Sequence, residues 1–149
     1  MVPTKRELCN LEDDGWAELK GLVESLSREQ MEEPGYYPDW SAKDLLAHLA
    51  AWMAEAARIL TQVHYGTYLK RDLDVDAMNK EFFAANHDLP LSVVRAEAFA
   101  ARNRMLSEVN AIDQMIPEAE DWFEEAGPRH YQEHLPRLKE WVQELQGRA

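Results

Sequence analysis

Four long segments of this chain place apolar residues at every third or fourth position. This spacing lines side chains up on one face of an α-helix, so each segment predicts an amphipathic helix with one buried stripe. No alternation of apolar and polar residues extends beyond a few positions, and no internal repeat is present. The chain is therefore expected to be all-α, a four-helix bundle forming a single domain over residues 1–149.

Local signals mark where these helices begin. Thr4 and Glu7 have the spacing of a capping box, and so do Ser41 and Asp44. Pro128 suits the first position of the last helix, where its missing N–H would be unpaired anyway. The four helices are expected over residues 4–27, 41–63, 92–112 and 128–145. Shorter helices are expected within 74–88 and 118–126.

Each predicted helix has its own core stripe. In the first helix the stripe is Leu8, Leu11, Gly15, Leu19, Leu22 and Leu26. In the second it is Leu45, His48, Leu49, Trp52, Ala56, Ile59 or Leu60, and Val63. In the third it is Val94 or Arg95, Ala98, Phe99, Arg102, Met105 or Leu106, Val109 and Ile112. In the last it is His130, His134, Leu138, Trp141 and Leu145.

The charge and composition exclude several classes of protein. Lys and Arg total 16 against 28 Asp and Glu, a net charge of −12. Nucleic-acid and anionic-membrane binding need a basic face, so neither is expected. No apolar run is long enough to span a bilayer, and the first residues lack a signal-peptide core, so a cytoplasmic protein is expected. Cys9 is the only cysteine and cannot form an internal disulfide.

Three histidines fall on core stripes. His130 and His134 lie four residues apart, which places them on one helix face with β-carbons about 6 Å apart. Two imidazoles at this spacing can converge on one metal ion. His48 lies inside the apolar stripe of the helix over residues 41–63 and is the third candidate ligand.

The depth of each histidine in its helix supports their meeting. His48 follows Ser41 by seven residues, about 10 Å at 1.5 Å per residue. His130 and His134 follow Gly127 by three and seven residues, roughly 4–10 Å. If helix directions alternate along the chain, the two helices are parallel and begin at the same end. The three rings are then expected at similar depth, facing one interior point.

A core histidine taken alone is more often hydrogen-bonded than metal-bound, and this alternative applies to each ring. Three inward histidines without a metal would leave several polar nitrogens in need of partners. Together they predict a divalent metal site. Imidazole suits zinc, nickel and iron(II), with zinc or nickel favoured here. Three protein ligands leave a position for water or substrate, as in catalytic sites. His64 and His87 fit no such pattern and are expected at the surface.

Ligand imidazoles normally donate their second N–H to an acceptor. Asp44, one turn before His48 on the same helix face, is a candidate for this supporting role. Its function as a helix cap is the alternative.

Further residues are candidates for substrate binding. Arg102 on the third stripe either reaches solvent or an acidic partner, or binds an anionic group of the substrate near the metal. Asn79 either lines the pocket mouth or is a surface polar residue. Trp40, with Tyr36 and Tyr37, either shapes an entrance between helices or packs the loop.

With "DWSAKDLLAHLAAW" and "HYQEHLPRLKEW" both present, the chain resembles the DinB/YfiT-like superfamily of metalloenzymes, in particular its ClbS/DfsB and maleylpyruvate isomerase N-terminal groups. The resemblance implies a four-helix bundle in which the second and fourth helices are parallel neighbours. It also implies a long crossover between the second and third helices, which residues 66–90 can supply. The family's metal triad matches His48, His130 and His134. One departure is Leu135-Pro136-Arg137, where DinB-type members commonly carry Arg-Gly-Gln.

The resemblance implies a metal-dependent transferase, isomerase or hydrolase acting on a small electrophilic molecule, with a low-molecular-weight thiol as a further cofactor. One alternative is a non-catalytic protein that binds a toxic small molecule, or gives resistance to it, through the same cavity. Another is a structural protein that keeps the bundle without metal. A homodimer is expected from the resemblance and from the five Trp and five Tyr residues, because aromatic residues favour interfaces.

Overall fold

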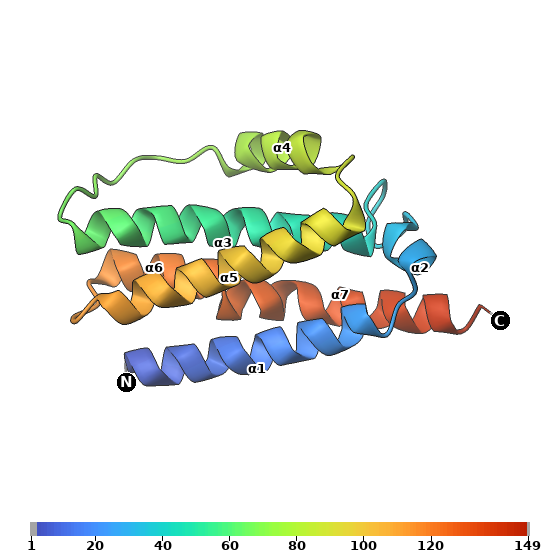
Figure 1. Ribbon diagram of the computed structural model, residues 1–149, viewed down its shortest axis with the longest axis horizontal. Helices are drawn as coiled ribbons and strands as arrows, with labels where there is room; N and C mark the ends of the chain where they lie inside the picture. Colours follow the sequence, from blue (N-terminus) through green and yellow to red (C-terminus); the bar gives the residue numbers. More distant parts are fainter. Residues whose placement is uncertain (1–2, 149) are drawn as a thin grey trace.

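The computed structural model describes residues 3–148, and these residues form a helical bundle without a β-strand (Figure 1). The elements in chain order are α1 (Lys5–Glu24), α2 (Arg28–Glu32), α3 (Ala42–His64), α4 (Val75–Asn86), α5 (Leu91–Ala111), α6 (Pro117–Ala126) and α7 (Pro128–Gln146). The four long helices are those that the apolar spacing predicts. The all-α bundle is thus confirmed, and no helix among these residues has the length and apolarity to cross a membrane.

Capping interactions begin the helices at the predicted positions. The Thr4 side chain accepts a hydrogen bond from the Glu7 amide at the start of α1. Ser41 and Asp44 form a complete capping box at the start of α3, each side chain accepting from the other residue's backbone N–H. A second complete box, with Ser27 as its first residue, begins the short helix α2, which the apolar spacing does not reveal.

Two long helices run in each direction (Figure 1). Helices α1 and α5 are antiparallel, because the Lys5 ammonium donates to the Ile112 carbonyl (2.6 Å) while Arg102 pairs with Glu12 (2.7 Å). Helices α3 and α5 are parallel. Lys43 near the start of α3 donates to the Leu89 carbonyl just before α5, at 2.9 Å.

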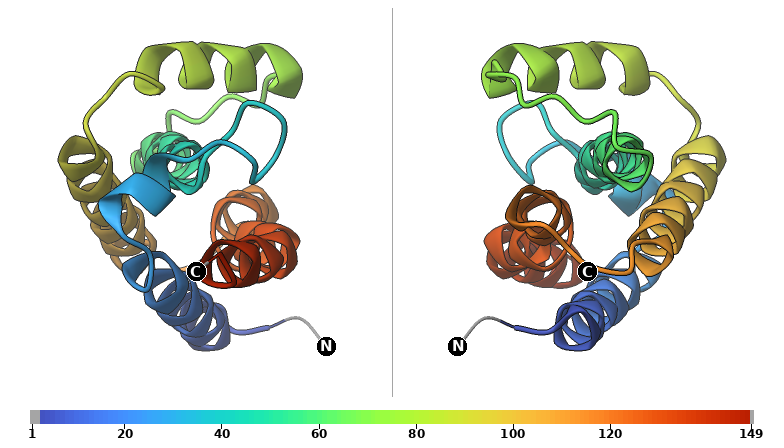
Figure 2. Two further views of the ribbon diagram at one scale, coloured as in Figure 1. Left: turned by 90° about the vertical axis from the view of Figure 1, so that its right-hand side faces the viewer. Right: turned by 90° about the vertical axis from the view of Figure 1, so that its left-hand side faces the viewer.

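The predicted parallel packing of the second and fourth long helices is wrong, since α3 and α7 run in opposite directions (Figure 1). The reason lies in the crossover after α3. It leads back through α4, which covers α3 from outside (Figure 2), so α5 begins at the same end as α3. Directions therefore do not alternate along the chain, and α7 returns antiparallel to α3.

The core lies between the four long helices and is built mainly from Leu, Ala and Val side chains. Two predicted core residues lie outside it: Leu11 is 47% exposed and Phe99 is 58% exposed. On α1 the inward position next to Leu11 is occupied by Glu12, which is fully buried. Leu8 and Leu19 are buried as predicted, so the stripe of α1 departs from the predicted one locally, where the buried Glu12 carboxylate takes the place of Leu11.

Candidate metal centre

The three predicted histidines come together inside the bundle. His48 lies on α3 and His130 and His134 on α7, and one ring nitrogen from each lies within 4.8 Å of the other two. Their ring centroids are 4.7 to 5.2 Å apart. The Nε2 atoms of His48 and His130 are separated by 2.9 Å. The predicted convergence is found, although the predicted helix direction is not.

Although α3 and α7 are antiparallel, their histidines lie at the same depth along the bundle. This is possible because α6 packs along the C-terminal part of α3 before α7 begins. Trp122 on α6 packs near Trp52 (6.3 Å between ring centroids), while His130 packs near His48. The 23 residues of α3 span about 34 Å, and His48 lies roughly 9 Å from its start. Helices α6 and α7 run back from the C-terminal end of α3, and the stretch from Pro117 to His134 covers about 26 Å at the same rise. His134 therefore reaches about the same depth along α3 as His48.

Burial makes all three imidazoles poor bases. Desolvation, with a contribution from His134, lowers the pKa of His48 to about 4. Desolvation lowers the pKa of His130 to about 3, assisted by the other two histidines. The pKa of His134 is lowered as well, again by burial, against an opposing effect of Glu133. At neutral pH the cluster therefore presents uncharged rings, the form in which imidazole binds metal.

The buried Tyr36 hydroxyl fixes the orientation of His134. It lies 2.9 Å from His134 Nδ1 and 3.5 Å from the His134 carbonyl oxygen. Burial raises the pKa of Tyr36, so the phenol keeps its proton. If the Tyr36 oxygen accepts from Nδ1–H and its O–H points to the carbonyl, the lone pair of His134 is on Nε2. This is the arrangement usual for metal-binding histidines.

The donor set fits a divalent ion. Tetrahedral Zn–N bonds of about 2.0–2.1 Å separate two ligand nitrogens by roughly 3.3 Å. The His48 and His130 Nε2 atoms are 2.9 Å apart, and the ring nitrogens of the three histidines all lie within 4.8 Å of one another. His130 Nδ1 is buried and has no hydrogen-bond partner within the described chain, and Nε2 of the same ring lies 2.9 Å from His48 Nε2. A hydrogen bond between these two neutral rings satisfies only one nitrogen of His130. Among residues 3–148, no carboxylate joins the cluster of residues that can share one ion. The three neutral nitrogens suit zinc, nickel or iron(II).

Asp44 does not support a ligand histidine as predicted. Its Oδ2 atom accepts from the Ser41 amide (2.9 Å) and hydroxyl (3.0 Å), and its Oδ1 lies 2.9 Å from His87 Nδ1. Both carboxylate oxygens are thus engaged by Ser41 and His87, and no hydrogen bond joins Asp44 to His48. The supporting role falls to Tyr36, on the loop before α3. His64 is exposed as expected, and the partly exposed His87 belongs to the Asp44 contact.

Arg102 is also not in the candidate substrate site. It donates two or more hydrogen bonds to the fully buried Glu12 and lies over the Trp16 ring. The predicted role in substrate binding is therefore wrong, and the acidic-partner alternative is correct. Helix α5, which carries Arg102, contributes no residue to the cavity beside the histidines.

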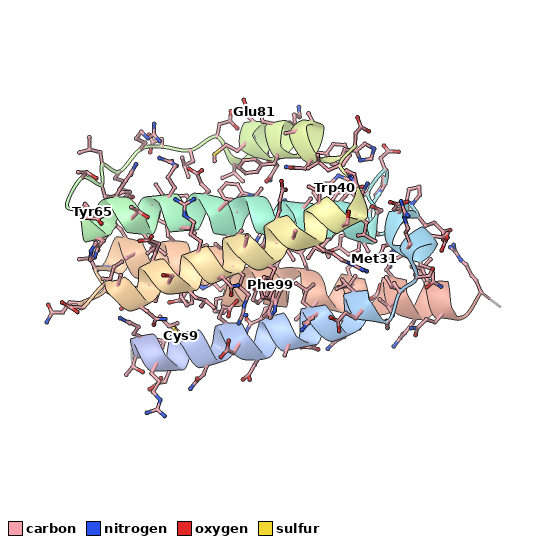
Figure 3. All side chains as sticks on the ribbon, viewed as in Figure 1. Cys9, Met31, Trp40, Tyr65, Glu81 and Phe99 are labelled. Carbon is pink, nitrogen blue, oxygen red and sulfur yellow. The ribbon has the colours of Figure 1, made fainter. Side chains whose placement is uncertain are left out.

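A cavity of about 630 Å³ opens onto the three histidines. Trp40 and Asn79 both line it, at the positions proposed from the sequence. Trp40 lies between α3 and α4 (Figure 3), with its ring 5.3 Å from that of His48 and stacked on Phe83. Asn79 accepts a hydrogen bond from the Trp52 indole (2.8 Å). The other lining residues are Tyr37, Trp52, Arg58, Ile59, Tyr68, Leu69, Lys70, Arg71, Leu73, Val75, Asp121, Trp122, Glu125, Ala126 and Glu133.

Two features around this cavity were not predicted from the sequence. Tyr36 was expected to shape an entrance or pack the loop, whereas its hydroxyl contacts a ligand candidate. The segment before α4 forms one wall of the cavity and was not predicted to do so. Its exposed apolar residues Leu69 and Leu73 could have indicated this role from the sequence. Apolar residues in an otherwise polar connection indicate a surface with something to bind.

Comparison with known proteins gives a family and a fold. The family of the mycothiol maleylpyruvate isomerase N-terminal domain matches residues 13–149. No curated protein matches the chain. Among solved structures, an uncharacterised protein from Escherichia coli UTI89 is similar, with a TM-score of 0.79 at 17% sequence identity. The similarity covers 97% of this chain and 96% of that one, and at this identity it establishes the fold.

Proposed function

Because the chain belongs to the mycothiol maleylpyruvate isomerase N-terminal domain family, part of the DinB/YfiT-like superfamily, we propose that it is a metal-dependent enzyme. It acts as a transferase, isomerase or hydrolase on an electrophilic small molecule, with a low-molecular-weight thiol or water as the nucleophile. The observation that carries the proposal is the cluster of His48, His130 and His134 beside a cavity of ligand size. The family name supports the choice of a thiol.

His48, His130 and His134 would hold the ion. A bound divalent ion lowers the pKa of a coordinated water or thiol and so supplies a nucleophile at neutral pH. The burial of the three rings keeps them uncharged, so protons do not compete for their lone pairs near neutral pH. The Tyr36 hydroxyl contacts Nδ1 of His134, so Nε2 is the nitrogen with which this ring would bind the ion.

The remaining residues of the site position and enclose the substrate. Trp40 covers His48 from the loop side and limits the access of water there. Trp52 is one helical turn beyond His48 on α3, and its hydrogen bond to Asn79 fixes its ring in the cavity wall. A reacting group beside the histidines is thus enclosed by aromatic surface, which strengthens electrostatic interactions in the site.

The test is metal content followed by turnover. Protein purified without an affinity tag is expected to contain close to one equivalent of zinc, nickel or iron per chain. It should then consume an electrophile such as maleylpyruvate in the presence of one member of a panel of thiols that includes mycothiol and glutathione. Metal without turnover by any thiol or by water would favour the alternative, a small-molecule binding protein. Less than a tenth of an equivalent would exclude the metalloenzyme.

A further inference from the structure

The cavity beside the histidines is a long groove rather than a small pocket. It extends along α3 from His48 to Arg58 and Ile59, both of which line it. Ten residues of helix separate His48 from Arg58, which corresponds to about 15 Å at 1.5 Å per residue. A volume of about 630 Å³ lies in the range of sites for drug-sized ligands. A nucleophile and a small electrophile at the histidines would leave most of this groove unfilled.

Aromatic rings form the wall of the groove next to the histidines. Trp52 on α3 and Trp122 on α6 face each other at 6.3 Å between ring centroids, inclined by 32°. Trp52 is fixed by its hydrogen bond to Asn79 and by edge-on packing against Phe82. Rigid indole faces at the side of a cavity favour planar, conjugated ligands, which stack on them.

Aliphatic side chains form the opposite lip, on the crossover between α3 and α4. Leu69 is 78% exposed, and Leu73 and Val75 are also exposed to solvent. All three line the groove. Exposed apolar side chains gathered at a cavity mark a binding site, because a ligand that covers them removes apolar surface from water.

The charges at the groove give no net preference for an anion or a cation. The basic lining residues are Arg58 on α3 and Lys70 and Arg71 on the crossover, and the acidic ones are Asp121 and Glu125 on α6 and Glu133 on α7. The three basic residues are thus matched by three acidic ones. Apolar contact is the interaction that this surface offers over most of its length.

We propose that the groove binds an elongated, uncharged or weakly charged molecule with a planar aromatic or conjugated part. The aromatic part lies against Trp52 and Trp122, and an apolar extension lies under Leu69 and Leu73. This proposal rests on the proposed function only in placing the reacting end of the molecule at the histidines. Binding in the groove itself requires no metal.

The test uses N-phenyl-1-naphthylamine, a neutral aromatic probe whose fluorescence rises in apolar surroundings. Chelator-treated protein is expected to bind one probe per chain, with energy transfer from tryptophan. In the double variant Leu69→Ser/Leu73→Ser the probe should bind about tenfold more weakly, because two apolar contacts are lost. Both side chains are exposed, so the change leaves the core intact.

Phe99→Ser is the matched control, because Phe99 is an exposed apolar residue on α5 outside the groove (Figure 3). It should bind the probe like the original protein. Trp122→Leu keeps the wall apolar but removes the ring face, and should also weaken binding of the aromatic probe. No binding by the original protein, or equal affinity in the groove and control variants, would overturn the proposal. Because chelated protein is used, these outcomes are independent of metal content and turnover.

Discussion

The hydroxyl of Tyr36 determines which nitrogen of His134 faces the other two histidines. Its oxygen lies 2.9 Å from Nδ1, and the tyrosine side chain is fully buried. Held in this way, His134 offers Nε2 to the cluster without having to rotate when a ligand arrives. Residues that orient a metal-binding imidazole typically contribute 10- to 100-fold to metal affinity, so Tyr36 should matter for binding although it is not itself a ligand.

Replacing Tyr36 by Phe is expected to weaken metal binding by roughly tenfold to a hundredfold while the fold is retained. The ring that fills the core is kept, and only the hydroxyl is lost. Titration of zinc against a competing chelator measures the effect. Tyr37→Phe is the control, because Tyr37 is exposed and makes no contact with His134 among the hydrogen bonds of the structure. Unchanged zinc affinity in Tyr36→Phe would show that His134 is oriented by other contacts.

His130→Ala is expected to abolish metal binding or reduce it to a small fraction of an equivalent per chain. Two imidazoles remain, and they hold a divalent ion far less well than three. His64→Ala and His87→Ala are the controls, because neither side chain belongs to the cluster. Metal analysis of the three purified variants and the original protein gives the answer. The same metal content in all four proteins would exclude the three-histidine site.

At the scale of helices, a buried ionic cluster joins α1, α5 and α7. The Glu12 carboxylate accepts from the Arg102 guanidinium at 2.7 to 3.1 Å and from the Tyr131 hydroxyl at 2.6 Å. Glu12 is fully buried, and the side chain of Arg102 is only 13% exposed. Tyr131 directly follows His130 on α7. The cluster therefore holds the helix that carries two of the three histidines against α1.

Arg102→Met should destabilise the protein by about 3–5 kcal/mol, because it leaves the Glu12 carboxylate buried without its countercharge. Urea unfolding followed by circular dichroism measures the loss. Arg104→Met is the matched control on the same helix, since Arg104 is exposed, and should change stability by less than about 0.5 kcal/mol.

A second substitution separates the ion pair from packing around it. In the double variant Arg102→Met/Glu12→Gln no buried charge is left unpaired, and Asp13, which also contacts Arg102, is exposed to solvent, so much of the stability should return. If the double variant is as unstable as Arg102→Met plus Glu12→Gln taken separately, the two residues do not act as a pair.

The same cluster explains what the sequence could predict and what it could not. Apolar spacing was sufficient for α3 and α7, whose inward faces are almost wholly apolar apart from the histidines, and these helices carry the site. On α1 the apolar spacing predicted Leu11 as the core residue instead of Glu12, because a Glu side chain is normally exposed. The burial of Glu12 depends on Arg102 and Tyr131, which are 90 and 119 residues away, and no local spacing reports such partners.

The helix directions could not be predicted for a related reason. The sequence indicates a long crossover over residues 66–90, but it does not indicate at which end of the bundle this crossover ends. In the structure α4 lies over α3 and returns the chain to the end where α3 begins (Figures 1 and 2). The convergence of the three histidines was predicted correctly because their apolar surroundings can be read from the sequence alone. The assumed alternation of helix directions was not needed for them to meet.

At the scale of the whole molecule, the use of aromatic residues bears on assembly. Each of the five tryptophans is at least partly buried, and Trp40, Trp52 and Trp122 serve the cavity. Most of these aromatic residues therefore have a role within one chain, and their number is no longer an argument for a dimer interface. We propose a homodimer on the family resemblance alone. Light scattering at micromolar concentration should give twice the 17.2 kDa mass of the chain, and a monomer would contradict it.

The pH dependence of stability is a further property of the whole molecule. In the folded, metal-free protein the pKa of His48 is about 4 and that of His130 about 3, against about 6.5 in an unfolded chain. Between these values the unfolded chain binds more protons than the folded one, so acidification favours unfolding. Chelator-treated protein should therefore lose roughly 2 kcal/mol per histidine between about pH 7 and pH 5. Denaturant unfolding of His130→Gln should show a correspondingly smaller loss.

Metal binding should respond to pH differently from the stability of the metal-free protein. The folded His48 and His130 rings remain uncharged down to about pH 4, and burial lowers the pKa of His134 as well, so protons compete weakly for the three lone pairs at mildly acidic pH. An ion that binds only the folded state raises its stability according to the ratio of free metal to Kd. Excess zinc should therefore raise Tm by similar amounts at about pH 7.5 and pH 5.5. Histidines exposed to water would be mostly protonated at the lower pH, and the increase in Tm would then be largely lost. Such a loss would mean that the three rings bind the ion from an open, hydrated arrangement, contrary to the buried cluster of this structure.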